Sequence, residues 1–255
     1  MQRLRYSTWS SVVTRAVALE TVPLTGSTNA DLLARLGSGE LIDEHYWLRA
    51  ERQESGRGRL GRSWTSEAGN LFCSTVVHVN VADPPVTTLS FVAALAVHDA
   101  IAHRLGGQSS LRLKWPNDVE VGGAKIAGIL LERLERFVVV GIGINVAHAP
   151  TIEGRRTISM REACQDAAIG PAEVLVDLAD RFAVRLDVWR SRGSDATLAQ
   201  WSTRSHKPSE QLTVSNPGGG NLQGSFAGVS ADGALRLRMP DGSIRDVYAG
   251  DIGPG

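Results

Sequence analysis

The sequence contains few of the residues that form disulfide bonds or bind structural metal ions. Its two cysteines, Cys73 and Cys164, do not form a C-x-x-C pair, and its six histidines are scattered with no H-E-x-x-H motif. These absences exclude a disulfide framework and argue against a structural zinc site or a protein-bound transition metal. We therefore expect a reduced, cytoplasmic protein.

Long apolar runs and an excess of either charge are also lacking. No segment reaches the length of a membrane span, and the first ten residues contain no apolar core of a signal peptide. The 27 basic and 27 acidic residues cancel, so no overall field would draw the chain to nucleic acid or to a membrane. The 42% hydrophobic content over 255 residues nevertheless supports a normal buried core.

A dense glycine and arginine stretch, GRGRLGR at residues 56–62, is the feature that stands out. Glycine allows close backbone approach and arginine offers a planar fork of donors, so such a loop suits a polyanion. The stretch also fits G-x-G-x-x-G, but it lacks the preceding apolar strand and the following helix, so we reject dinucleotide binding. No P-loop motif occurs elsewhere. A basic surface loop is the plain alternative.

The hydrophobic periodicity predicts an α+β fold, in which a mixed sheet is flanked by helices. Residues 111–132 alternate with tight turns, which indicates a β-meander and not a βαβ unit. The expected strands are 16–24, 45–50, 71–79, 111–114, 125–132 and 137–146, and the expected helices are 30–36, 88–105, 171–189 and 195–205. Near residue 207 the composition changes to short strands with Gly/Asp turns, typical of a small barrel. We predict domains at 1–206 and 207–255.

Polar groups recur at strand ends and turns of the first domain, with no nucleophile elbow and no pair of acid/base carboxylates. A site rich in Arg and Lys but poor in general bases suits the joining of a carboxylate to a nucleoside triphosphate, because positioning and cations supply most of that catalysis. Three such groups begin a helix, whereas an N-cap needs only one. The polar set is Ser27, Thr28, Asn29, Gln53, Arg57, Arg59, Lys114 and Lys125.

Five motifs together, and in this order, resemble those of biotin protein ligases. They are GSTN at 26–29, Gln53 with GRGRLGR at 56–62, KWPND at 114–118, KIAGIL at 125–130 and GIGIN at 141–145. The resemblance covers roughly residues 20 to 255 and implies a biotin/lipoate ligase-like catalytic domain followed by a small SH3-like β-barrel. It implies that biotin and ATP form biotinyl-5′-adenylate, which then transfers biotin to a lysine of a biotin carboxyl carrier protein. Mg²⁺ is expected with ATP, although its ligands are not identified.

The resemblance also implies roles for individual residues. The biotin-binding set would be Ser27, Thr28, Asn29, Gln53, Arg57, Gly58, Arg59 and Lys114. The nucleotide-binding set would be Arg57, Arg59, Lys114, Lys125, Gly141, Gly143 and Asn145. Arg59 and Lys114 would be catalytic: Lys114 as the contact to the biotin carboxylate and α-phosphate, Arg59 as part of a mobile lid. Lys125 is equally compatible with a solvated strand-start lysine, and Asn117 and Asp118 fit turn formers better than metal ligands.

Two departures from the family limit the resemblance. Fewer than about twenty residues precede the first strand, too few for a winged helix-turn-helix, so we expect a ligase without DNA binding. Residues 148–156 lack a tryptophan that caps the adenine in some relatives. The oligomeric state, including a homodimer, stays open.

Two other functions compete with biotin ligation. Lipoate ligation or octanoyl transfer uses a similar fold, but the Gly/Arg loop and KWPN favour biotin. A nucleic-acid-binding module would need exposed aromatics among its basic residues, and the small barrel supplies only Phe226 and Tyr248.

Overall fold

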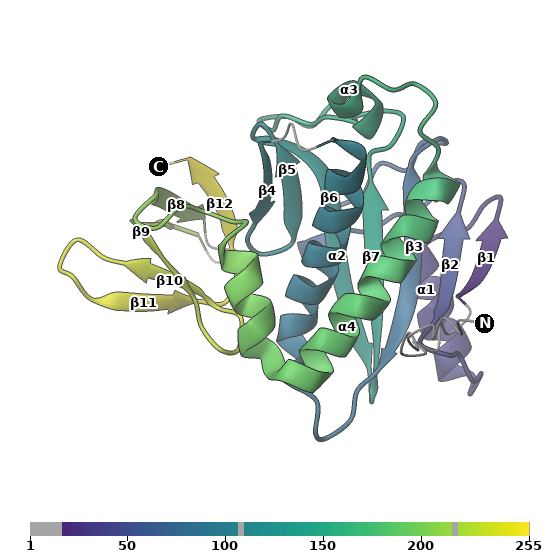
Figure 1. Cartoon of the computed structure of the whole chain (residues 1–255), viewed down its shortest axis with the longest axis horizontal. Coiled ribbons are helices and arrows are strands. Elements are labelled where there is room, and N and C mark those ends of the chain that lie inside the picture. Colours follow the sequence, from purple (N-terminus) through teal and green to yellow (C-terminus); the bar gives the residue numbers. More distant parts are fainter. Residues whose placement is uncertain (1–16, 107–109, 216–218, 255) are drawn as a thin grey trace, which may run out of the picture.

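The computed structural model describes residues 17–106, 110–215 and 219–254, and places a seven-stranded mixed sheet beside a smaller five-stranded one (Figure 1). The larger sheet has the order β1-β2-β3-β7-β6-β5-β4, in which only β1 and β2 pair in parallel. Its strands are β1 (Ala18–Val22), β2 (Tyr46–Ala50), β3 (Leu71–His78), β4 (Leu111–Lys114), β5 (Asp118–Val121), β6 (Ala124–Leu134) and β7 (Phe137–Ile144). The consecutive antiparallel pairing of β4 to β7 confirms the predicted meander.

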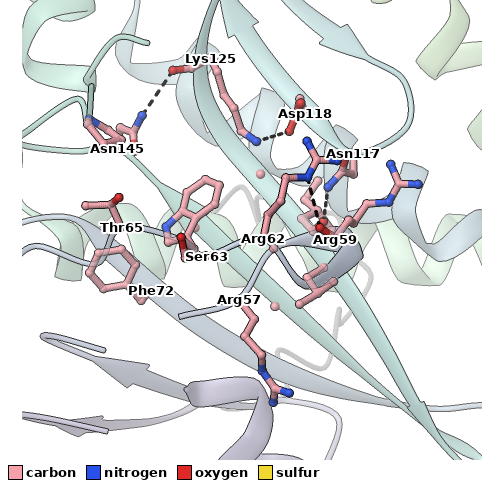
Figure 2. A pocket seen from close by; sticks show the side chains of 18 of the residues that line it. Arg57, Arg59, Arg62, Ser63, Thr65, Phe72, Asn117, Asp118, Lys125 and Asn145 are labelled. Atoms are coloured by element: carbon pink, nitrogen blue, oxygen red, sulfur yellow. Dashed lines mark hydrogen bonds and ion pairs between the residues drawn. The ribbon is translucent and has the colours of Figure 1, made fainter. Parts of the chain in front are cut away.

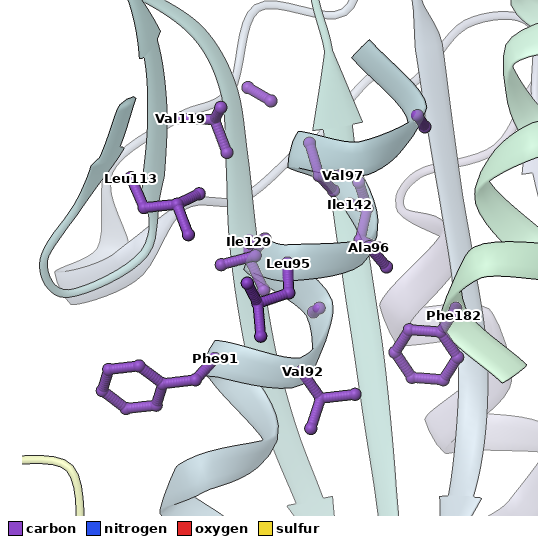
Figure 3. Close-up of a cluster of buried hydrophobic side chains, with 14 of the residues drawn as sticks. Phe91, Val92, Leu95, Ala96, Val97, Leu113, Val119, Ile129, Ile142 and Phe182 are labelled. Atoms are coloured by element: carbon purple, nitrogen blue, oxygen red, sulfur yellow. The ribbon is translucent and has the colours of Figure 1, made fainter. Parts of the chain in front are cut away.

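Two helices, α2 (Leu89–Arg104) and α4 (Pro171–Ser202), cover one face of the large sheet (Figure 1). Side chains of α2 such as Val92 and Leu95 pack there against Ile129 and Ile142 of the sheet (Figure 3). The segment Val86–Arg104 is long and apolar enough to cross a membrane by length and composition alone. Most of it is buried inside the protein, because it is the central helix of this core.

Among the described residues, one helix lies on the opposite face of the sheet, α1 (Thr28–Gly37). Its Leu32 and Leu36 pack with Leu48, Val76 and Val139 in a second, smaller cluster. Because successive side chains of a strand point to opposite faces, the residues of β7 that follow Val139 by two and four positions face the same side as α1. This side of the sheet is only partly covered, and it holds the cavity described below.

The helices differ from the prediction in two places. Residues 171–202 form one element, but Gly193 has φ 77° and ψ 174°, so the helix breaks between the two predicted segments at a conformation that glycine tolerates. A short helix, α3 (Met160–Cys164), was not predicted. Its signal is the capping box Ser159-x-x-Glu162, in which the Ser159 hydroxyl accepts from the Glu162 N–H.

The C-terminal strands form an antiparallel sheet in the order β11-β10-β9-β8-β12. They are β8 (Gln211–Ser215), β9 (Asn221–Val229), β10 (Leu235–Arg238), β11 (Ile244–Val247) and β12 (Asp251–Pro254). This agrees with a small SH3-like domain, although β11 and β12 do not pair, so the described strands form no closed ring. The Trp115 Nε1–H donates to the Gly233 carbonyl at 3.1 Å and joins the two sheets.

Candidate functional site

A cavity of about 740 Å³ opens on the α1 face of the large sheet. Strands β3, β6 and β7 form its floor, the first residues of α1 form one end, and the loop after β2 crosses over it. One residue of the C-terminal sheet, Asp251, reaches its rim. Of the predicted site residues, all but Lys114 line this cavity: Ser27, Thr28, Asn29, Gln53, Arg57, Gly58, Arg59, Lys125, Gly141, Gly143 and Asn145.

Uncharged polar groups make up one end of the cavity. Ser27 occupies the N-cap position of α1, but its hydroxyl caps no backbone N–H. The side chain of Gln53 takes that place, because its Oε1 accepts from the Thr28 N–H at 2.9 Å and lies 3.2 Å from the Thr28 hydroxyl. The side chain of Ser27 therefore does not cap the helix, and it lines the cavity.

Two residues at this end were missed from the sequence. Ser74 of β3 is fully buried, and its Oγ lies 2.7 Å from Thr28 Oγ1 and 2.6 Å from Asn29 Oδ1. Glu132 of β6 accepts from the Asn29 Nδ2 at 2.8 Å. Each is a polar residue within an apolar strand, which the sequence does show. Only the register of the sheet reveals that its side chain faces the cavity side.

The glycines of the floor are explained by side chains that lie directly on them. A Cβ at Gly141 would come within 2.3 Å of Asn29 Oδ1, and one at Gly143 within 2.5 Å of the Trp64 ring. Gly128 of β6 is the third, since its Cβ would lie 2.7 Å from the same indole. The Trp64 ring and the Asn29 amide can lie directly on the floor because these three positions are glycine; any larger residue there would clash with them.

Trp64 itself was not identified from the sequence. Its ring lies over the strand glycines, its Nε1 is buried without a hydrogen-bond partner among the described residues, and the Lys125 Nζ is 4.9 Å from its centroid. The sequence-based expectation for an aromatic cap concerned residues 148–156, which contain no tryptophan. The sequence feature that could have identified Trp64 is its position, two residues after the end of the Gly/Arg loop.

The Gly/Arg loop folds back on itself across the cavity (Figure 2). The Gly58 N–H donates to the Arg62 carbonyl at 2.7 Å, and Leu60 adopts a left-handed φ of 58° between them. Arg62 forms an ion pair with Asp251 at 2.8 Å, which ties the loop to β12. Arg59 is half-buried, and its Nη1 has no hydrogen-bond partner in the part of the chain that the structure describes. This burial lowers the pKa of Arg59, while the charge of Asp251 opposes the shift.

The other end of the cavity is charged. Lys125 Nζ lies 2.6 Å from Asp118 Oδ1, and Arg155 contacts the second carboxylate oxygen (Figure 2 shows the lysine and the carboxylate). Burial raises the pKa of Asp118, but Lys125 and Arg155 outweigh it and hold that pKa below its usual value. Burial also lowers the pKa of Lys125, against the opposing charge of Asp118. The lysine is thus a buried cation and not a solvated one.

Asp118 is correspondingly more than a turn former, because it neutralises two cations in the cavity wall. Asn117 does what the turn interpretation predicts: its Nδ2 donates to the Ile129 carbonyl at 2.7 Å and holds the turn onto β6. The amide of Asn145 is also structural, since it donates to the carbonyls of Lys125 and Ile158, both at 3.3 Å. Asn145 therefore fixes the strand that presents Lys125.

Lys114 lies elsewhere than predicted. It belongs to β4, the outermost strand of the sheet, and is not among the residues that line the cavity. Its Nζ contacts Glu120 Oε1 at 3.0 Å, and that carboxylate is itself almost fully buried. This conformation does not support the predicted ligand contact of Lys114, because Glu120 already pairs its ammonium and strand β5 separates β4 from the cavity floor at β6.

Comparisons with known proteins agree with this architecture. The sequence profile of the Biotin/lipoate A/B protein ligase family matches residues 23–147, and that of the Biotin protein ligase C terminal domain matches residues 212–252. The chain is 37% identical to the Biotin--[acetyl-CoA-carboxylase] ligase of Mycobacterium tuberculosis, with 92% of this chain and 88% of the relative covered. The protein of the same name from Paracoccus denitrificans is 36% identical, with 86% and 93% covered.

A solved structure shares the fold over most of this chain. It is the biotin protein ligase from Aquifex aeolicus in complex with biotin and ATP, with a TM-score of 0.79 at 25% identity, covering 92% of this chain and 97% of that one.

Proposed function

This chain belongs to the Biotin/lipoate A/B protein ligase family. From that premise we propose that it couples biotin to the AMP portion of ATP and then transfers the biotin to a carrier protein. The first product is biotinyl-5′-adenylate with release of pyrophosphate, and the second is a biotinylated lysine with release of AMP. The observation that carries the proposal is the division of one cavity into an uncharged polar end and a cationic end. Biotin has a neutral, hydrogen-bonding ring system at one end and a carboxylate at the other, so both ends of the cavity find a match.

The uncharged end takes the biotin ring in this proposal. Thr28, Asn29 and Ser74 present a mixed set of donors and acceptors, and Gln53 holds them in place. A neutral cyclic urea offers N–H donors and a carbonyl acceptor, which these groups can satisfy without burying a charge. Ser27 completes the set from the free N-cap position.

Lys125 takes over the role that the sequence motif had given to Lys114. Its ammonium is buried in the cavity and can lie between the biotin carboxylate and the α-phosphate. One carboxylate oxygen attacks the α-phosphorus, the bond from that phosphorus to the bridging oxygen breaks, and pyrophosphate leaves with the electron pair. Lys125, together with Arg59 of the loop, offsets the charge that gathers on the phosphoryl oxygens, so no general base is needed.

Trp64 and the glycine floor provide a flat surface that suits the adenine base of ATP. The ring lies against Gly128 and Gly143, where a larger residue would clash with it. Stacking of a base on an aromatic side chain contributes about 1–3 kcal/mol. Mg²⁺ would enter bound to the triphosphate, since among the described residues no three His, Cys, Asp or Glu side chains form a metal site.

The second step needs an open route for the carrier's lysine. The uncharged lysine amine attacks the carbonyl carbon of the mixed anhydride, and AMP leaves. The extra proton on the attacking nitrogen is lost to water, which leaves an amide. A loop that covers the intermediate and then withdraws would protect it from hydrolysis meanwhile. Arg57, Gly58 and Arg59 are the residues that we assign to this cover.

The partner is a carrier domain of a biotin-dependent carboxylase, supported by the acetyl-CoA-carboxylase in the names of the two relatives. We place the protein in the cytoplasm, where free thiols such as Cys73 and Cys164 persist. A nucleic-acid-binding role finds little support, because Phe226 is buried and Tyr248 is the one exposed aromatic of the pair. DNA and membrane binding are not proposed, and a homodimer remains to be tested by sedimentation.

The decisive experiment is an ATP–pyrophosphate exchange assay followed by transfer of labelled biotin to an added carrier domain. We expect exchange that depends on biotin and on Mg²⁺, then label on the carrier lysine. Exchange that depends on lipoate or octanoate instead of biotin would contradict the substrate assignment. Absence of exchange together with tight, salt-sensitive binding of single-stranded nucleic acid would contradict the enzyme assignment.

A further inference from the structure

Glu132 lies at the junction between the uncharged end of the cavity and the arginine loop. It belongs to β6, on the same face as Gly128, because side chains alternate along a strand. One carboxylate oxygen, Oε2, accepts from the Asn29 Nδ2 at 2.8 Å. The other, Oε1, lies 4.0 Å from the Arg57 Nη2. A single side chain thus contacts both the helix end and the loop.

The carboxylate also fixes the direction of a hydrogen-bond chain. An ionised carboxylate only accepts, so the Asn29 amide must turn its NH₂ toward Glu132 and leave its Oδ1 to the Ser74 hydroxyl. Ser74 has one proton, and once it is given to Asn29 the contact of 2.7 Å to Thr28 requires the Thr28 hydroxyl to donate. The charge of Glu132 therefore sets which atoms of Asn29, Ser74 and Thr28 can donate to a ligand.

The same chain returns to the far end of the loop. The Thr28 N–H donates to Gln53 Oε1 at 2.9 Å. Gln53 Nε2 in turn donates to the Ser66 hydroxyl at 3.0 Å, and Ser66 donates to the Trp64 carbonyl at 3.1 Å. Both ends of the stretch 57–64 are thus tied to one buried network, through Glu132 at the start and through Ser66 at the end.

We propose that Glu132 is a positioning residue that orders the donors of the uncharged end and couples them to the arginine loop. This rests on the proposed function for the identity of the ligand, but the coupling itself exists in the free protein. Glu132 does not need to touch biotin or ATP for this. Its effect passes through Asn29 on one side and Arg57 on the other.

The variant Glu132→Gln keeps the shape and removes the charge. The Leu130 carbonyl, 3.4 Å from the Asn29 Nδ2, is then the acceptor that remains, so the orientation of the amide is set less strictly, and Arg57 loses its counter-charge. Glu135→Gln is the matched control, because Glu135 is exposed in the turn at the end of the same strand. Glu132→Asp, which keeps the charge on a shorter stem, should recover part of the coupling.

The first measurement is amide hydrogen exchange of the ligand-free proteins, which requires no assumption about the substrate. We expect faster exchange in Glu132→Gln at the Thr28 amide and at the Gly58 and Trp64 amides, which bond to Arg62 and Gly56. The control should match the wild type. Exchange that is unchanged in Glu132→Gln at all three amides would overturn the coupling, whatever the enzyme's substrate proves to be.

The second measurement separates positioning from a general loss of structure. Charge-assisted hydrogen bonds are worth enough that we expect the biotin KM of Glu132→Gln to rise about tenfold or more, with a smaller change in kcat and unchanged far-UV circular dichroism. In a double-mutant cycle with Arg57→Ala the two effects should not add. A fall in kcat alone, or full additivity, would contradict the role assigned to Glu132.

Discussion

The two ends of the cavity solve the problem of buried polar groups in different ways. At the α1 end, side chains that are neutral apart from Glu132 satisfy one another through hydrogen bonds, as in the chain through Asn29 and Ser74. At the other end, Lys125, Arg155 and Asp118 satisfy one another as ions. Neutral networks provide shape and direction at little electrostatic cost, whereas buried cations can be recruited by a phosphate that competes with the carboxylate. The difference indicates which end recognises and which end reacts.

A second contrast lies within the charged residues. Lys114 and Lys125 both occur in short motifs shared with biotin protein ligases, and both form ion pairs with a buried carboxylate. Only Lys125 faces the cavity. The comparison of the two lysines therefore separates the effect of a buried ion pair from the effect of a cation in the site.

The largest effect is expected for Lys125→Met. Removing a cation aimed at the reacting phosphate should lower the rate of biotin-dependent pyrophosphate exchange about 10²–10³-fold or more. The loss should fall on kcat, as measured by initial rates at saturating biotin and ATP. Exchange close to the wild-type rate would show that a cation other than Lys125 stabilises the transition state.

Gly141→Ala tests the uncharged end. The added Cβ would meet Asn29 Oδ1 at 2.3 Å, so the amide must move and the order of donors is lost. Overpacking of this kind costs about 1–3 kcal/mol, which corresponds to a rise in biotin KM of roughly ten- to a hundredfold. Isothermal titration with biotin alone checks this, and unaltered affinity would place the biotin ring elsewhere in the cavity.

Arg59→Gly tests the cover between the two ends. Loss of the half-buried guanidinium should leave the intermediate poorly retained, so bystander lysines become labelled while pyrophosphate exchange continues. Labelling of added serum albumin with biotin and ATP measures the release. If the variant retains its intermediate as well as the wild type does, Arg59 does not belong to the cover.

Asp118→Asn tests whether the Asp118 carboxylate keeps Lys125 protonated. Burial lowers the pKa of Lys125 and Asp118 opposes that shift, so without the carboxylate the pKa should fall further. Activity that requires the ammonium is present below this pKa and is lost as pH rises through it. The alkaline limb of the exchange rate should therefore move to lower pH in the variant. A limb that stays in place would show that Lys125 does not control it.

The smallest catalytic effect is expected for Lys114→Met. The variant loses a contact to Glu120, with Arg112 and Arg155 still 3.8 Å from that carboxylate. We expect kcat and both KM values near those of the wild type and a stability lower by about 1–3 kcal/mol in urea unfolding. A large loss of kcat with intact stability would mean that β4 reaches the substrate in a state other than this one.

Much of this protein could be predicted from its sequence because the signals are local. Apolar periodicity identified the long helices and every strand of the large sheet except β5, and glycine with Asp turns identified the C-terminal sheet. The motifs around Asn29, Gln53 and Arg59 also identified residues that line one cavity. Each of these is encoded by residues close together in the chain.

What the sequence could not decide is which side chains meet across strands. Ser74, Glu132 and Trp64 became part of the site only through the register of β3 and β6 and the path of the loop, because a shift of one residue turns a side chain to the opposite face. The choice between Lys114 and Lys125 was of the same kind. The sequence by itself determined the family, the elements and a cation-rich site; the tertiary structure decided which lysine is in that site, because sheet order places β6 in the floor and β4 at the edge.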